Sequence, residues 1–178
     1  MRRVVPIVWL LVGAPSWATT LITVDEALKL AFPGGVIERE TVFLTEEQRL
    51  TAEKEGGSEV SSSIVTRFSA KGEDAVALGW AYLDTHRVRT LPETLMIVLD
   101  PNGTVRHVEV VTFREPLEYM PRVGWYEQYR GQELDDDLAI KRDIRPVTGA
   151  TLTARATTEA VRRVLAVHKA ITGSGVGR

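Results

Sequence analysis

The sequence predicts a single α+β domain, built on a twisted, mainly antiparallel sheet with helices packed against it. Two apolar runs on either side of residues 100–103 have the pattern of an antiparallel hairpin. Residues 154–171 carry apolar side chains at helical spacing. The chain has 178 residues, of which 44% are hydrophobic and 26% charged, and this length and composition fit one globular domain.

Residues 1–18 have the pattern of a secretory signal peptide. Two arginines precede an apolar run over residues 4–12, and a small-x-small cleavage site follows that ends at Ala18. The apolar run is too short for a transmembrane helix, which needs about 20 residues. We therefore expect cleavage after Ala18 and a mature domain over residues 19–178 outside the cytoplasm, with an uncleaved membrane anchor as the alternative.

Two short helices are expected at the start of the mature domain. Thr23 with Glu26, and Thr45 with Gln48, have the capping-box pattern, in which two side chains three residues apart satisfy free N–H groups at a helix start. Proline and glycine end such helices. The expected stop signals are Pro-Gly-Gly at residues 33–35 and Gly-Gly at residues 56–57.

Four strands are expected, near residues 60–68, 75–83, 94–100 and 104–113. In the second of these, large and small side chains alternate, which predicts one bulky face that includes Leu78, Trp80 and Tyr82. The last two strands flank Asp100-Pro101-Asn102-Gly103, a tight-turn signal. Because the first strand begins among serines, a flexible linker is the alternative there.

The composition excludes several classes of function. The chain has no cysteine, so it forms no disulfide, thiolate zinc site or iron–sulfur cluster, and redox chemistry would need an organic cofactor. A net charge of -2 with scattered basic residues argues against nucleic acid as a partner. His86, His107 and His168 are too widely spaced for a local metal motif, although the fold could still bring them together. Residues 135–137, all aspartates, are expected to be the solvated first turn of a short helix rather than a cation site.

Residues 114–137 break the strand pattern, because prolines and glycines frame a group of aromatic side chains. These aromatics are Tyr119, Trp125, Tyr126 and Tyr129. Aromatic side chains in such a segment suggest the wall of a binding site, and packing of the segment onto the sheet explains them equally well.

Threonines gather where the last helix is expected to begin. Thr148, Thr151 and Thr153 lie around Gly149, just before the helical pattern. The first N–H groups of a helix have no internal partners and its dipole is positive there, so this position favours an anion. The spacing is that of neither a P-loop nor a dinucleotide fold. From the residues alone, a phosphate site and a simple helix cap both remain open.

The segment DIRPVTGATLT, from Asp143 to Thr153, resembles the Asp…Ser/Thr-Gly-Ala-Ser/Thr-x-Thr signature of the FMN-binding domain family. This family includes flavin-bearing subunits of the sodium-pumping NADH:quinone oxidoreductase and Rnf complexes. The resemblance covers roughly residues 75–170 and implies FMN bound to Thr153 as a covalent phosphoester. It also implies a flavin transferase that installs FMN from FAD. The surrounding turn would be Thr148, Gly149, Ala150 and Thr151.

The expected function is that of an extracytoplasmic electron-transfer flavoprotein, with redox proteins or quinones of unknown identity as partners. The membrane-complex subunits of the family are anchored, so association of this chain with such a complex stays open. The alternatives are a flavin-dependent reductase of a small substrate, with His86 or His107 as proton donor, and a non-redox interaction module.

Glu115, Trp125 and Tyr126 are candidates for the surroundings of the flavin, because an aromatic side chain can stack on the ring and a polar group can bind its edge. The alternatives are core packing for Trp125 and a surface ion pair with Arg114 or Arg122 for Glu115.

Overall fold

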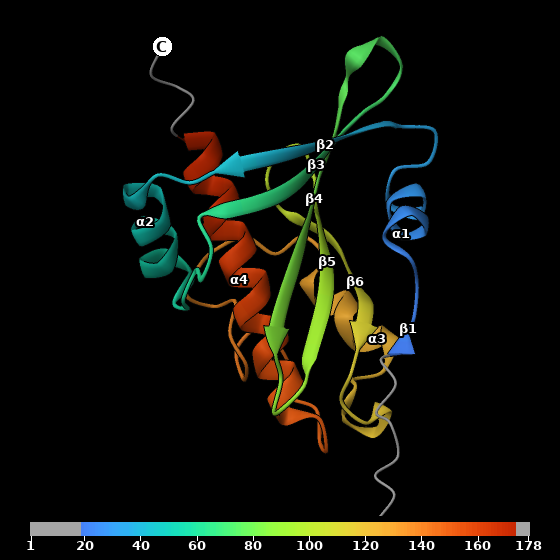
Figure 1. Cartoon of the computed structure of the whole chain (residues 1–178). Coiled ribbons are helices and arrows are strands. Elements are labelled where there is room, and N and C mark those ends of the chain that lie inside the picture. Colours follow the sequence, from blue (N-terminus) through green and yellow to red (C-terminus); the bar gives the residue numbers. More distant parts are fainter. Residues whose placement is uncertain (1–18, 174–178) are drawn as a thin grey trace, which may run out of the picture.

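The structure is a computed structural model that describes residues 19–173; the expected signal peptide lies outside the described residues. In the described part, six antiparallel strands form one sheet in the order β1-β6-β5-β4-β3-β2 (Figure 1). The strands are β1 (Thr19–Thr20), β2 (Val36–Phe43), β3 (Ile64–Lys71), β4 (Ala77–Arg87), β5 (Pro92–Leu99) and β6 (Val105–Phe113). The helices are α1 (Val24–Ala31), α2 (Glu46–Gly56), α3 (Val123–Tyr126) and α4 (Thr151–Gly173), with 3₁₀ turns η1 (Glu73–Ala75), η2 (Leu117–Tyr119) and η3 (Glu127–Tyr129). The predicted α+β class is confirmed.

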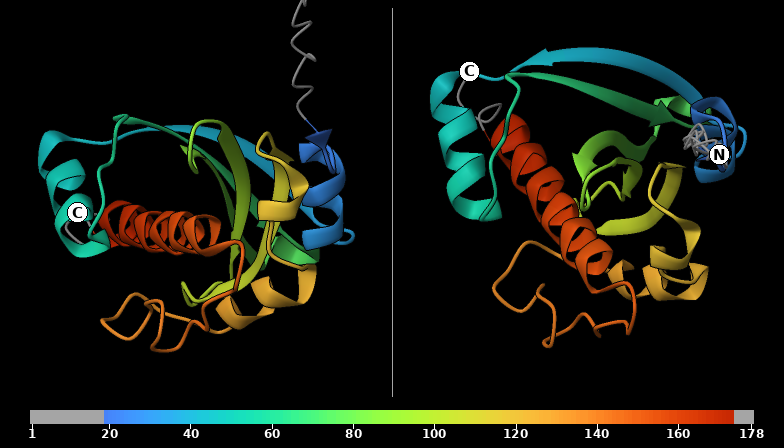
Figure 2. Two further views of the ribbon diagram at one scale, coloured as in Figure 1. Left: turned by 90° about the horizontal axis from the view of Figure 1, so that it is seen from below. Right: turned by 60° about the horizontal axis from the view of Figure 1, so that its bottom comes forward.

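The two faces of the sheet are covered by different helices (Figure 2). On one face, α4, α3 and η3 pack against apolar side chains of β4, β5 and β6, including Tyr82, Ile97 and Val108. On the other face, α1 packs through Leu28 and Phe32 against a second apolar cluster. The second half of α4 also contacts α2. This arrangement leaves the N-terminal end of α4 near the β4–β5 turn.

The helix predictions from local signals are confirmed. Thr23 and Thr45 each accept a hydrogen bond from the backbone N–H three residues later, and both capping boxes are complete. Gly57 ends α2 in the left-handed conformation, with φ of 72°. The last helix is longer than the expected 154–171, because it begins at Thr151 and continues to Gly173. The threonine cluster therefore lies partly inside its first turn.

The strand predictions need two corrections. The described part of the chain contains two strands that the sequence pattern did not predict, β1 and β2, one at each edge of the sheet. No residue of β2 is fully buried, so its sequence shows no clear alternation. The expected single bulky face of residues 75–83 is also wrong. Trp80 and Tyr82 face α4, whereas Leu78 packs with the cluster under α1.

Gly79 explains this change of face. The β3–β4 ladder is irregular next to it, and Gly79 has φ of +133°. A Cβ atom at this position would lie 2.1 Å from the carbonyl oxygen of Leu99, so no other residue fits without a backbone shift. The irregularity reverses the facing of the side chains before it.

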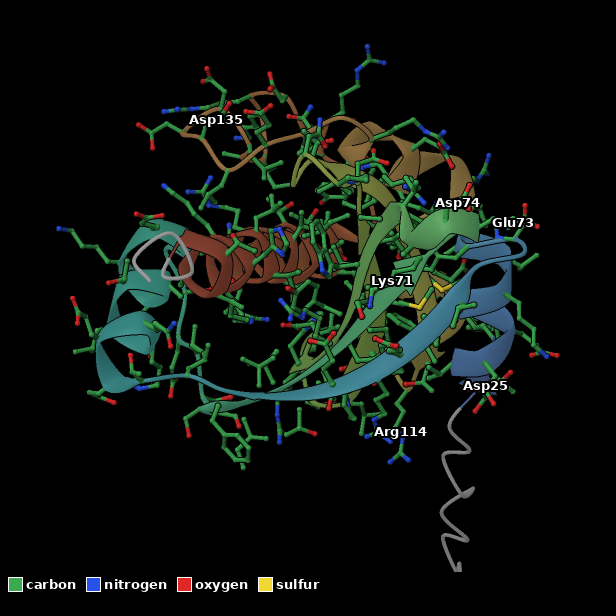
Figure 3. All side chains as sticks on the ribbon, turned by 90° about the horizontal axis from the view of Figure 1, so that it is seen from above. Asp25, Lys71, Glu73, Asp74, Arg114 and Asp135 are labelled. Carbon is green, nitrogen blue, oxygen red and sulfur yellow. The ribbon has the colours of Figure 1, made fainter. Side chains whose placement is uncertain are left out.

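The expected short helix at residues 135–137 is not formed. The Asp135 carboxylate instead accepts hydrogen bonds from the N–H groups of Asp137 and Leu138, at 2.9 Å each, which closes a local turn. Asp135 lies in the loop between η3 and α4 (Figure 3). None of the helices between residues 19 and 173 combines the length and the apolar character needed to cross a bilayer.

Candidate functional site

Thr153 is in the first turn of α4, and its side chain points into the protein. It is only 1% exposed, because η2 lies over it. Its hydroxyl donates a hydrogen bond of 2.6 Å to the carbonyl oxygen of Tyr119. The hydroxyl thus joins the start of α4 to a segment more than thirty residues earlier.

A small cleft of about 200 Å³ opens beside Thr153. Three segments form it: the β4–β5 turn, η2 and the start of α4. The lining residues are Arg89, Tyr119, Gly149, Ala150, Leu152 and Thr153. The guanidinium of Arg89 lies 4.7 Å from the centre of the Tyr119 ring, a cation–π contact that holds a positive charge at the cleft.

The backbone at this end of α4 is free to bind an anion. Within residues 19–173, the N–H groups of Thr151, Leu152 and Thr153 have no protein acceptor. Gly149 has φ of +85°, and a Cβ atom there would meet nothing within 4 Å, so the approach to these groups is open. The helix dipole and Arg89 both favour negative charge here. The start of α4 therefore suits a negatively charged group such as a phosphate.

Glu115 holds the turn that carries Arg89. Its Oε1 atom accepts hydrogen bonds from the backbone N–H groups of Arg89, Thr90 and Leu91, at 3.2, 2.7 and 2.8 Å. Burial alone would raise the pKa of Glu115, but these hydrogen bonds outweigh it and lower the pKa. Glu115 is 7% exposed and makes no surface ion pair with Arg114 or Arg122. It positions the cleft without lining it.

Trp125 is also not among the residues that line the cleft. Its indole N–H donates a 2.7 Å hydrogen bond to the carbonyl of Arg145. Its ring contacts Tyr126 and Tyr129 edge to face, at centroid distances of 5.2 and 5.5 Å. Both tyrosines are buried, so packing onto the sheet accounts for them. The hydrogen bond of Trp125 therefore joins α3 to the loop that leads into α4.

The other threonines of the motif have different surroundings. Thr151 is exposed, and its hydroxyl donates to the carbonyl of Val147 at 3.3 Å. Thr148 is exposed and does not line the cleft. Ala150 is buried, and its carbonyl accepts the first backbone hydrogen bond of α4, from Ala154 at 2.9 Å. Of the three threonine hydroxyls, that of Thr153 is the one at the cleft.

His86 belongs to a separate, buried ionic cluster that joins β4, β5 and α4. Its two ring nitrogens contact Asp84 at 2.9 Å and Glu93 at 3.1 Å. Arg163 of α4 makes two 2.8 Å hydrogen bonds to Asp84. Burial would lower the pKa of His86, but the two carboxylates outweigh it and raise the pKa to about 9. His86 is therefore a positively charged structural link at neutral pH.

The other histidines lie away from Thr153 too. His107 contacts Glu109 on its own strand at 2.9 Å, and neither His107 nor His86 lines the Thr153 cleft. Among residues 19–173, no group of three or more His, Asp or Glu side chains is placed to hold a metal ion.

Three lining residues of the cleft were not predicted from the sequence: Leu152, and the cation–π pair of Arg89 and Tyr119. Tyr119 was noted only as one of a group of aromatics. Arg89 lies in a turn with no motif of its own, and the structure brings it to Thr153 from more than sixty residues away. A long-range contact of this kind leaves no local pattern in a single sequence.

Comparison with known families gives a match over part of the chain. Residues 91–166 match the model of the FMN-binding domain. This range begins at the turn held by Glu115, includes the whole threonine motif and ends inside α4. Comparisons with curated proteins and with solved structures give no match. Over residues 91–166, the chain is therefore similar to the FMN-binding domain family.

Proposed function

We propose that this chain is an extracytoplasmic electron carrier that holds FMN covalently on Thr153. The observation that carries the proposal is the position of the Thr153 hydroxyl, which lies at a cleft with unpaired helix N–H groups and the guanidinium of Arg89. These groups would hold the phosphate of FMN. Bound FMN supplies the redox chemistry, and the protein supplies position and electrostatics.

Attachment requires a flavin transferase and FAD. In this reaction Thr153 would supply the oxygen that bonds to the phosphorus on the FMN side of FAD. The pyrophosphate bond would break with AMP as the leaving group, and the threonine hydroxyl would lose its proton. Unpaired N–H groups and Arg89 stabilise the negative charge of the resulting phosphodiester. Thr148 and Thr151 are the nearby hydroxyls that would assist binding without forming the ester.

The size of the cleft supports a carrier over a reductase. Pockets that enclose a small ligand measure about 300–1,000 Å³, whereas this cleft measures about 200 Å³. A cleft of this size would hold the phosphate end of FMN rather than enclose the whole cofactor. No carboxylate or imidazole of the described residues lines it as a proton donor.

Covalent attachment also suits a protein outside the cytoplasm. A noncovalent cofactor would face very dilute free ligand there, so its occupancy would demand a very low dissociation constant. The arginine-rich, apolar and small-x-small pattern of residues 1–18 supports export. N-terminal sequencing should find a mature protein that begins at Thr19; a detergent-extracted species that begins at Met1 would instead indicate an anchor.

The proposed function is tested on protein produced in an exporting host, with and without a flavin transferase. We expect a flavin spectrum that survives denaturation, and a mass increase of one FMN less one water, only with the transferase. The reduced protein should pass electrons to a quinone analogue and a soluble cytochrome with little selectivity. If the protein reduced one small substrate at tens per second or faster, while it reduced the quinone analogue and the cytochrome slowly, the reductase would be favoured.

A further inference from the structure

The sheet opens between β3 and β4. The two strands are paired as far as Arg67 and Tyr82, although β3 begins at Ile64 and β4 continues to Arg87. Figure 1 shows β3 turning away from β4 along this stretch. A cleft of about 910 Å³ lies in the opening and is lined by residues 58–62, the start of β3, the end of β4 and α4. It shares no lining residue with the cleft at Thr153.

The backbone of β4 has free hydrogen-bonding groups in this opening. Arg87 lies opposite Pro92 of β5, and proline has no N–H, so the N–H and C=O groups of Arg87 point to the β3 side. Bonded and non-bonded pairs alternate along an antiparallel ladder, so the backbone groups of Thr85 point the same way. Neither residue is paired with β3, and no other described segment bonds to these backbone groups. Both residues are exposed.

The edge of β3 across the opening is satisfied by its own chain. Ser63 bonds through its C=O to Leu44 next to β2, so Ile64 presents its backbone to the opening. The hydroxyl of Ser62 accepts a hydrogen bond from the N–H of Ile64 and donates one to its C=O, both at 3.0 Å. Among the described residues, the edge of β4 has no such local partner. An unpaired edge of this kind is a template for another strand.

The buried charges in this cleft are paired with one another. Arg163 bonds to Asp84, and Asp84 bonds to His86, so this cluster offers no free charge. Glu59 and Glu159 differ from it, because both line the cleft, both are exposed and neither makes an ion pair within residues 19–173. These two carboxylates favour a lysine or arginine in the occupant of the opening.

The rest of the lining combines apolar and hydroxyl-bearing side chains. The apolar ones are Val60, Val65, Val164 and Val167, and the hydroxyl-bearing ones include Ser61, Ser62, Thr66 and Thr85. Ile64, which also lines the cleft, is 55% exposed. An extended chain presents its side chains alternately to its two sides, so a segment of valine and threonine suits these mixed walls.

We propose that an extended segment of a partner polypeptide binds in this opening by strand addition to β4. About five residues, at roughly 3.3 Å each, cover residues 83–87. Thr85 and Arg87 supply the backbone hydrogen bonds, valine and threonine side chains of the segment contact the walls, and its basic residue pairs with Glu59 or Glu159. The site does not require FMN, so it stands apart from the proposed function.

The free edge is tested by hydrogen exchange of single amides, on protein made without a flavin transferase. The N–H groups of Asp84 and His86 bond to β5, whereas those of Thr85 and Arg87 face the opening. We expect exchange at Thr85 and Arg87 to be at least about tenfold faster. Equal exchange at all of these amides would overturn the proposal. Protection of Thr85 and Arg87 that grows with protein concentration would also overturn it, because it would assign the edge to a second copy.

A matched pair of peptides tests strand addition itself: acetyl-KVTVTVK-amide and acetyl-KVTPTVK-amide. The proline removes one N–H and disfavours pairing in the middle of a strand, while length and charge are kept. Each peptide is titrated into the same protein labelled with ¹⁵N. With the valine peptide we expect saturable shifts of the Thr85 and Arg87 amide resonances, with a dissociation constant on the order of 0.1–1 mM. The proline peptide should bind at least about tenfold more weakly.

Thr85→Pro removes an N–H group that faces the opening, a position at which a strand tolerates proline. The folded variant should bind the valine peptide at least about tenfold more weakly, whereas Thr85→Val, which keeps this N–H, should bind it as the wild type does. If Thr85→Pro does not fold, the comparison of the two peptides on the wild type decides. The proposal is overturned if the valine peptide does not shift these amides, if both peptides bind equally, or if folded Thr85→Pro binds as the wild type does.

Discussion

The hydroxyl of Thr153 donates a 2.6 Å hydrogen bond to the carbonyl oxygen of Tyr119. An esterified threonine oxygen has no proton, and two oxygens at this distance would repel each other. Attachment of FMN would therefore break this contact, and we expect η2 to shift away from α4. The proposed modification should change the segment that covers the threonine as well as the threonine itself.

We predict faster amide hydrogen exchange in residues 116–120 of flavin-loaded protein than in unloaded protein. In the structure, the N–H groups of Tyr119 and Met120 donate hydrogen bonds to carbonyls within this segment. Displacement of the segment would weaken those hydrogen bonds. Exchange measured by mass spectrometry checks this, with peptides from α1 as the internal control. Equal exchange in the two forms would show that Thr153 is modified without movement of η2.

Arg89→Gln should slow covalent loading by about tenfold without abolishing it. The substitution removes a positive charge from the cleft, and a charge-assisted hydrogen bond to a phosphate contributes about 1.5–3 kcal/mol. The time course of flavin fluorescence in denaturing gels gives the rate. Arg39→Gln, which removes an exposed arginine from the distant strand β2, is the matched control. Equal rates for the two variants would remove Arg89 from the site.

The stability contributed by His86 should be lost at alkaline pH. Its pKa is raised from 6.5 to about 9 in the folded protein, so its contribution is fully present below about pH 6.5 and is lost as pH rises through 9. The advantage of wild type over His86→Gln in free energy of unfolding should fall by on the order of 3 kcal/mol between pH 6 and 9.5. Urea unfolding at each pH measures it. A constant difference would mean that His86 is not charged in the folded state.

Gly79→Ala should destabilise the fold by about 3 kcal/mol or more, because the new Cβ atom meets the Leu99 carbonyl at 2.1 Å and the backbone is left-handed. Gly57→Ala is the control, since its φ is also positive but nothing lies within 4 Å of the new atom. Gly57→Ala should lower the free energy of unfolding by about 1 kcal/mol. Similar losses in the two variants would show that strain alone, and not the contact with Leu99, requires Gly79.

Structural features that depend on neighbouring residues could be predicted from the sequence. The capping boxes at Thr23 and Thr45, the turn after Leu99 and the glycine at the end of α2 all depend on neighbouring residues. The threonine motif placed the candidate site at the start of α4, which is where the cleft lies.

Features that depend on distant contacts were not readable. The role of Glu115 depends on three N–H groups about 25 residues earlier, and the need for Gly79 depends on a carbonyl of the neighbouring strand. Strand β2 was not predicted because an edge strand without a fully buried face shows no clear alternation of apolar and polar side chains. The burial of Thr153 under Tyr119 also depends on the tertiary fold.

The most direct test of the central proposal is the site of flavin attachment, read from peptide masses of Thr153→Val and Thr151→Val made with a flavin transferase. Valine keeps nearly the shape of threonine but has no side-chain oxygen. At the buried position 153, loss of the hydrogen bond should lower the free energy of unfolding by about 1–3 kcal/mol. The dispersion of amide resonances in an NMR spectrum checks that each variant is folded. We expect no covalent FMN on folded Thr153→Val, and slower but complete loading of Thr151→Val at Thr153. Covalent FMN that persists on Thr153→Val after denaturation, or a wild type that carries none beside a competent transferase, would contradict the account.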